Sequence, residues 1–121
     1  MSTEPRTTTV GVFVTKPLEI DEPDWCKGHD EDLAQYKVDV SHEGPTHTIA
    51  PGGREVFRAF LTQAPFSTVD RTVGLYVEPY LTPRTCTPAE VDQLAADLIE
   101  AAGQLRSLGR ELAALLEGGD Q

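Results

Sequence analysis

Residues 87–119 read TPAEVDQLAADLIEAAGQLRSLGRELAALLEGG, and they predict one long helix. The opening TPAE has the form of a capping box, in which the Thr87 hydroxyl accepts from the backbone of Glu90 and the Glu90 carboxylate accepts from the backbone of Thr87. Proline suits the first helical position because its missing N–H would have no partner there. A Gly-Gly pair predicts the end. We therefore expect a helix over residues 88–117, about 45 Å long.

Apolar residues recur in this helix every seven positions, in two rows offset by three. The rows are Val91, Leu98, Leu105 and Leu112, and Leu94, Ala101, Leu108 and Leu115. Such a pattern needs an apolar partner. We expect the first half to cover a sheet and the second half to overhang it, because short strands span only about 17–20 Å.

A second copy of the chain is the favoured partner for this overhang, which predicts a homodimer, and a different protein is the alternative. The residues expected to bind the partner are Leu98, Leu105, Leu108, Leu112, Leu115 and Leu116.

Five segments ahead of the helix alternate apolar and polar residues or lie between turns, which predicts strands. They are residues 8–15, 35–40, 46–50, 54–62 and 72–78. The Pro-Gly-Gly at 51–53 predicts a β-hairpin, since glycine accepts the positive φ of a tight turn. We expect an α+β fold, with a small, mostly antiparallel sheet of about five strands followed by the long helix. After a disordered tail at 1–7, residues 8–121 form one domain.

The chain has 121 residues, and ten Lys and Arg against twenty Asp and Glu leave a net charge of −10. An acidic surface repels phosphate backbones, which argues against direct nucleic-acid binding. No segment approaches 18 consecutive apolar residues, so we expect no membrane span. The N-terminus lacks the order of a signal peptide, and with two cysteines we expect a cytoplasmic protein. A chain of this length can bury a core without metal or disulfide.

Much of the negative charge lies in residues 19–32, where seven acidic side chains face Lys27 alone. Proline and glycine also fall in this stretch, so it is expected to be a loop. An acidic loop either keeps the protein in solution, which we favour, or imitates nucleic acid and blocks a basic partner.

Cys26, His29, His42 and His47 offer sulfur and nitrogen ligands in the spacing C-x2-H-x12-H-x4-H. Their number suits zinc. A zinc finger needs its last two histidines on one helix, however, and the Gly-Pro at 44–45 excludes a helix between them.

A different zinc site remains open. A loop with Cys26 and His29 would fold onto a strand end with His42, and a carboxylate such as Asp24 or Asp30 would complete the shell. In the alternative, Trp25 and Cys26 fill the core while the histidines are polar surface residues.

Several short motifs occur together in this chain. They are Trp25-Cys26 followed by His29, Asp39-x-x-His42, Leu81-Thr82 and a Thr-Pro-Ala-Glu-Val opening to a Leu/Ala-rich helix. With them, residues 23–115 resemble domain-of-unknown-function family 6907, found in high-GC Gram-positive bacteria (actinobacteria) and their phages. The resemblance marks Trp25, Cys26, His29 and His42 as a set, leaves His47 outside the pattern and implies no catalytic residue.

Catalytic signatures are missing: the chain has no G-x-S-x-G, P-loop, G-x-G-x-x-G or H-E-x-x-H motif. A Cys26 nucleophile with His42 as its base would need basic surroundings, and these are the most acidic of the chain. A zinc hydrolase is the remaining enzymatic alternative. We expect a non-enzymatic, acidic protein-interaction or regulatory module that self-associates through its C-terminal helix, with zinc as a structural cofactor if bound. The acidic inhibitor of a basic partner is the second interpretation.

Overall fold

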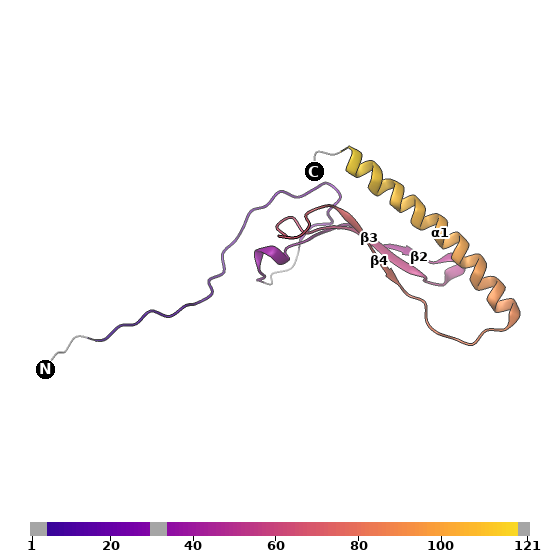
Figure 1. Cartoon of the computed structure of the whole chain (residues 1–121), viewed down its shortest axis with the longest axis horizontal. Coiled ribbons are helices and arrows are strands. Elements are labelled where there is room, and N and C mark those ends of the chain that lie inside the picture. The colour runs from indigo at the N-terminus through magenta and orange to yellow at the C-terminus, as the bar shows by residue number, and fades with distance from the viewer. Residues whose placement is uncertain (1–4, 30–33, 119–121) are drawn as a thin grey trace.

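The computed structural model describes residues 5–29 and 34–118. Within them, a small antiparallel sheet carries one long helix (Figure 1). The strands are β1 (His42–Glu43), β2 (His47–Ile49), β3 (Phe57–Gln63) and β4 (Gly74–Pro79), and the helix is α1 (Pro88–Glu117). Two 3-10 helices, η1 (Lys37–Asp39) and η2 (Pro51–Gly53), lie in the connections. The α+β class is confirmed, with four strands in place of about five.

Strand β3 is the centre of the sheet. One of its edges pairs with both β1 and β2, and its other edge pairs with β4, always antiparallel. Strand β2 lies opposite the first residues of β3, with Ile49 opposite Phe57, whereas β1 lies opposite the last, with His42 opposite Gln63. All strands are therefore held in place through β3.

The predicted hairpin at Pro-Gly-Gly joins β2 to β3. Gly52 and Gly53 have φ of 62° and 83°, which residues with a Cβ adopt only at a cost. The N–H of Val56 donates to the carbonyl of Ile49 at 2.8 Å and closes the loop. The predicted strands at 46–50, 54–62 and 72–78 are thus confirmed as β2, β3 and β4, with shifted ends.

Two predicted strands are wrong. Residues 8–15 are assigned no strand and are exposed, and residues 35–40 contain η1. Alternation shows that a segment suits a strand but does not specify its partner, and both edges of β3 are already paired, with β1 and β2 on one side and β4 on the other. Of the predicted tail, residues 1–4 lie outside the described part of the chain, and residues 5–7 are exposed.

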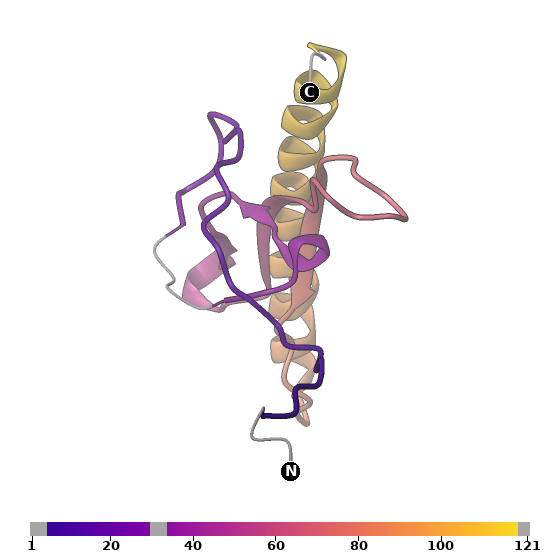
Figure 2. The ribbon, with the colours of Figure 1, turned by 90° about the vertical axis from the view of Figure 1, so that its left-hand side faces the viewer.

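Helix α1 is one continuous rod beside the strands (Figure 2). Ala101, fully buried, contacts Ile49 and Val56 to form the core, and partly buried side chains surround these three. The surrounding residues are Phe57, Leu98, Leu105 and Leu108. Asp97 is also buried and accepts a hydrogen bond from Nε2 of Gln93 at 2.9 Å.

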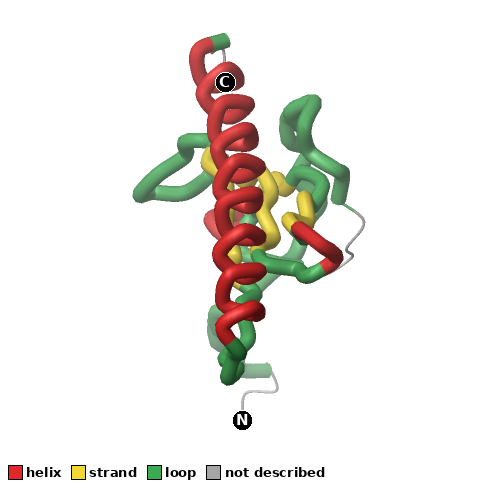
Figure 3. The backbone as a smooth tube through the Cα atoms, turned by 90° about the vertical axis from the view of Figure 1, so that its right-hand side faces the viewer, coloured by secondary structure: helices red, strands yellow, loops and turns green. Residues whose placement is uncertain are grey.

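The predicted overhang begins later than expected. Leu98, Leu105 and Leu108 were expected to bind a partner, but they pack against the core of their own chain. The seven residues of β3 span about 23 Å, more than the length assumed for the sheet. The last turns of α1 project beyond the strands (Figure 3).

The remaining residues expected at the overhang differ in exposure. Leu112 and Leu115 are half-buried, and Leu116 is 42% exposed. Self-association through these side chains stays a prediction. Among the described residues, no helix combines the length and apolar character that crossing a bilayer requires.

The capping box at the start of α1 is present as predicted. The Thr87 hydroxyl accepts from the N–H of Glu90 at 3.3 Å, and Oε1 of Glu90 accepts from the N–H of Thr87 at 3.0 Å. We expect Thr87→Ala to lower the free energy of unfolding by about 1 kcal/mol because the N–H of Glu90 loses its side-chain acceptor. Urea titration measures this loss. Thr85→Ala, an exposed control two residues away, should leave the midpoint unchanged.

Acid should weaken the same cap. The hydrogen bond from the backbone of Thr87 lowers the pKa of Glu90, with Arg84 adding a smaller effect. A carboxyl with a lower pKa in the folded state stabilises the fold above its unfolded pKa, and this stabilisation disappears as pH falls through the folded value. The variant Glu90→Gln keeps an acceptor oxygen but cannot be protonated. We expect its free energy of unfolding to fall less than that of the native chain when the pH is lowered from neutral to about 3. An unchanged pH profile would contradict this role.

The different burial of Leu105 and Leu116 predicts different losses of stability when each is shortened. We expect Leu105→Ala to lower the free energy of unfolding by about 1–2 kcal/mol, since its side chain packs against the core. The matched change Leu116→Ala removes a more exposed side chain and should change it by less than about 0.5 kcal/mol. Thermal unfolding of both variants at low protein concentration separates core packing from association. Equal losses would show that Leu105 is no better packed than Leu116.

Candidate metal centre

A turn places Cys26 beside the sheet. The N–H of Cys26 donates to the carbonyl of Pro23 at 3.0 Å, and the N–H of Lys27 donates to the carbonyl of Glu43 at 2.9 Å. The second bond fixes the segment along β1, the strand that carries His42. Gly28 follows with φ of 101°, a conformation that favours glycine, and the chain then reaches His29.

His42 is the buried member of the site. Its side chain is 2% exposed, and its ring lies edge-on to the rings of Trp25 and His29, with centroid distances of 6.3 and 5.3 Å. Burial is the main reason that the pKa of His42 is lowered, and the proximity of His29 contributes. Glu22 and a hydrogen bond with the backbone of Asp21 act in the opposite direction. The neutral ring that results is the form that binds metals.

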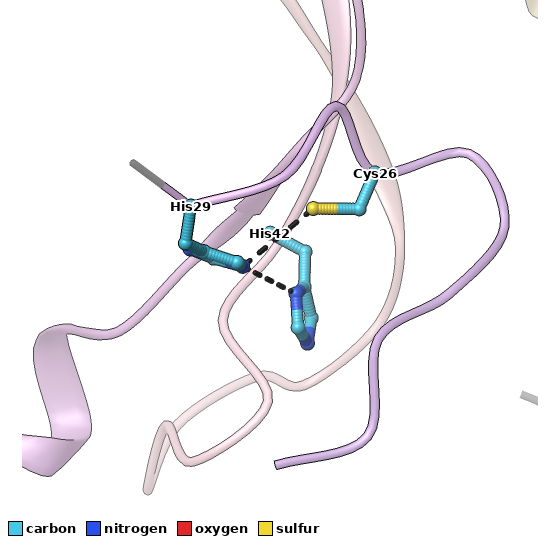
Figure 4. Close-up of side chains that lie close together, drawn as sticks. All are labelled: Cys26, His29 and His42. Atoms are coloured by element: carbon cyan, nitrogen blue, oxygen red, sulfur yellow. Dashed lines mark hydrogen bonds between the residues drawn. The ribbon is translucent and has the colours of Figure 1, made fainter. Parts of the chain in front are cut away.

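Three ligand atoms converge here (Figure 4). Nε2 of His29 lies 3.6 Å from Sγ of Cys26 and 3.2 Å from Nδ1 of His42. One potential ligand atom from each of the three residues lies within 4.8 Å of the other two. A ring nitrogen carries at most one hydrogen, so Nε2 of His29 can donate to only one of its two neighbours.

The short distances match those between the ligands of a tetrahedral zinc ion. Zn–N bonds of about 2.0–2.1 Å and a Zn–S bond of about 2.3 Å place two nitrogens about 3.3–3.4 Å apart and nitrogen and sulfur about 3.6 Å apart. Two sides of the Cys26–His29–His42 triangle thus fit. The third side, from Sγ of Cys26 to a ring nitrogen of His42, is at most 4.8 Å, so it must shorten by at most about 1.2 Å to close the shell.

Glu22 is a fourth group that the sequence analysis missed. Its Oε1 lies 4.0 Å from Nε2 of His29, and its side chain is 46% exposed. Glu22 precedes Pro23, and the turn that positions Cys26 also brings this carboxylate toward the cluster. Sequence spacing alone offered several acidic residues of equal standing, and only the direction of the turn distinguishes Glu22.

The other predicted ligands have different positions. His47 is exposed on β2, and neither it nor Asp24 belongs to the group of potential ligands found among the described residues. Asp30 lies outside those residues. His42 lies on the two-residue strand β1 and not at the end of the predicted strand 35–40.

The alternative without metal is wrong for one histidine. It expected all three histidines to be polar surface residues, but His42 is buried while His29 and His47 are exposed. Trp25 and Cys26 are half-buried and cover His42 without filling the core. The structure therefore joins Trp25, Cys26, His29 and His42 into one cluster.

Comparison with known proteins identifies a family without assigning an activity. Neither a curated protein nor a solved structure matches this chain. The model of one family, Domain of unknown function (DUF6907), matches residues 6–114. Because this match covers most of the sequence, the chain belongs to the DUF6907 family.

Proposed function

We propose that this protein is a small, non-enzymatic interaction module in which a zinc ion fastens the acidic segment 21–29 to β1. Cys26, His29 and His42 would be protein ligands, and the carboxylate of Glu22 would be the fourth. The supporting observation is the convergence of one sulfur and two ring nitrogens at distances near those of a tetrahedral zinc shell.

The small size of the core makes such a metal useful. In the described part of the chain, the buried apolar residues are Ile49, Val56, Ala59, Val73 and Ala101. Most of these side chains are small, and the core cluster around Ala101 lies under α1 and does not include segment 21–29. A structural metal contributes folding free energy where apolar burial is limited.

The charge around the cluster also favours a cation. Asp21, Glu22, Asp24 and Glu43 lie on the segment or on β1, with Lys27 as the single basic residue among them. A divalent ion reduces the repulsion between these carboxylates and stabilises the thiolate of Cys26. The ion would thus offset the charge repulsion that opposes holding this acidic segment beside β1.

The geometry supports a structural role better than a catalytic one. A catalytic zinc keeps one position open for water and needs a group that transfers protons to the substrate. In the proposed shell Glu22 occupies the fourth position, so the carboxylate nearest to His29 serves as a ligand and not as a base. The zinc hydrolase is therefore the second candidate, and it requires Glu22 to leave the metal.

Elemental analysis of protein purified without a histidine tag tests this proposal. We expect about one zinc per chain, which Cys26→Ser and His42→Gln each reduce strongly and Glu22→Gln reduces partly. Cys86→Ser and His47→Gln are matched controls with the same chemistry outside the cluster, and they should keep the full metal content. Substitution with cobalt should give a thiolate-to-metal absorption band that Cys26→Ser abolishes.

Stability measurements provide a second readout. Chelation should lower the unfolding temperature of the native chain and should have no effect on the Cys26→Ser variant, since metal binding stabilises only a chain with its ligands. Purification free of zinc, with no shift in unfolding temperature on adding it, would refute the proposed function.

A further inference from the structure

The N-terminal segment, residues 5–18, is an extended arm. Its apolar side chains are largely exposed, at 71% for Val10, 73% for Val12, 90% for Phe13 and 81% for Val14. Figure 1 shows the arm leading away from the sheet and helix. In the part of the chain that the structure describes, residues 5–18 make no hydrogen bond, and the edge-on contact of Phe13 with Tyr36 is their one ring contact.

The arm has the sequence of a strand without a sheet. Residues 8–15 read TTVGVFVT, in which six of the eight residues are β-branched and Phe13 is aromatic. These residue types favour pleated, half-buried backbone. Exposed apolar side chains and unpaired backbone groups together make this segment prone to pair with a sheet edge.

Among the described residues, β4 offers a longer strand edge without a neighbour than β2 does, with six residues against three. Strand β4 pairs with β3 alone among the described residues, so its outer edge is open. The N–H of Tyr80 donates to the carbonyl of Val56, and the antiparallel register then directs the backbone groups of even-numbered residues of β4 toward β3. Leu75 and Val77 direct their N–H and C=O groups outward.

Charge complementarity favours the same pairing. The arm carries Arg6 and Lys16 and no acidic residue, a charge of +2, so the rest of a chain with net charge −10 carries −12. Two bodies this acidic repel each other. Contact between the basic arm of one chain and the acidic body of another brings opposite charges together.

We propose that the arm of one chain adds as a strand to the outer edge of β4 in a second copy, with the reciprocal contact closing a two-fold dimer. Residues 8–15 would extend the sheet, and Val77 and Tyr76, exposed at 41% and 46%, would gain cross-strand neighbours on the two faces. The backbone groups of Leu75 and Val77 would gain partners.

The position of the arm favours pairing with β4 of a second copy over pairing with β4 of its own chain. The segment that follows the arm is fixed beside β1 through Lys27 and Glu43, on the edge of β3 opposite to β4. To reach its own β4, the arm would have to cross the sheet. The arm of a neighbouring chain meets the open edge without such a crossing.

Light scattering over a range of concentrations, combined with amide hydrogen exchange, tests the proposal. We expect the native chain to approach the mass of two chains as concentration rises, with protection of the Leu75 and Val77 amides increasing in parallel. The amides of Tyr76 and Glu78, directed toward β3, are internal controls and should be protected at all concentrations.

The variant Val12→Pro/Phe13→Pro should weaken association at least about tenfold, because neighbouring residues point their N–H groups to opposite sides and one of the two prolines must face β4. Its matched control, Val12→Thr/Phe13→Tyr, keeps strand-forming side chains and should still associate. On the acceptor edge, Val77→Pro removes an outward N–H and should weaken association, whereas Val77→Thr should not. Far-UV circular dichroism checks that each variant folds.

Three results would overturn this inference. The first is the mass of a single chain at every concentration, and the second is association that persists in the double proline variant. The third is protection of the Leu75 and Val77 amides in a monomer at every concentration, which would place the arm on its own chain. These variants leave Cys26, His29 and His42 intact, so metal content and association are judged separately.

Discussion

The hydrogen bonding of β3 on both edges is the constraint on which the rest of this structure depends. The strand lies between β4 on one side and β1 and β2 on the other. Its pairing with β2 places Ile49 beneath the helix, and its pairing with β1 places His42 beside the turn that carries Cys26. Core and candidate metal centre are thus positioned by successive residues of the same edge.

The core formed under this constraint is small. Ala101 lies against Ile49 and Val56 where α1 crosses the sheet, and its short side chain allows the helix to approach closely. Larger apolar residues of α1 surround this point and remain partly exposed. A core of this size leaves the acidic segment 21–29 outside the apolar cluster, and hydrogen bonds and the Cys26–His29–His42 triangle join that segment to the sheet.

The two proposals concern opposite edges of β3. On the edge formed by β1, converging sulfur and nitrogen atoms suit a zinc ion in acidic surroundings. On the edge formed by β4, outward backbone groups suit an added strand, and the basic arm has the composition to supply it. Each proposal provides partners for groups that the fold leaves unpaired: ligand lone pairs in the first case and main-chain donors and acceptors in the second.

The sequence by itself determined the elements whose causes are local. The capping box, the proline after Thr87 and the Gly-Gly end are encoded within a few residues, so helix 88–117 was predicted to the residue. The Pro-Gly-Gly turn was likewise predicted, because positive φ is a property of the glycines themselves. The sequence also contained Cys26, His29 and His42 as candidates.

Only the tertiary structure decided how these parts meet. Residues 8–15 alternate like a strand but are assigned to no strand of the sheet, because alternation does not specify a partner. The leucine rows predicted an apolar stripe, yet how far the sheet extends beneath it determined that Leu105 and Leu108 are covered. His47 and Asp24 were as plausible as ligands as Glu22, and the turn at 23–26 together with the pairing of β1 separated them. These outcomes depend on contacts between distant residues, which local sequence patterns do not encode.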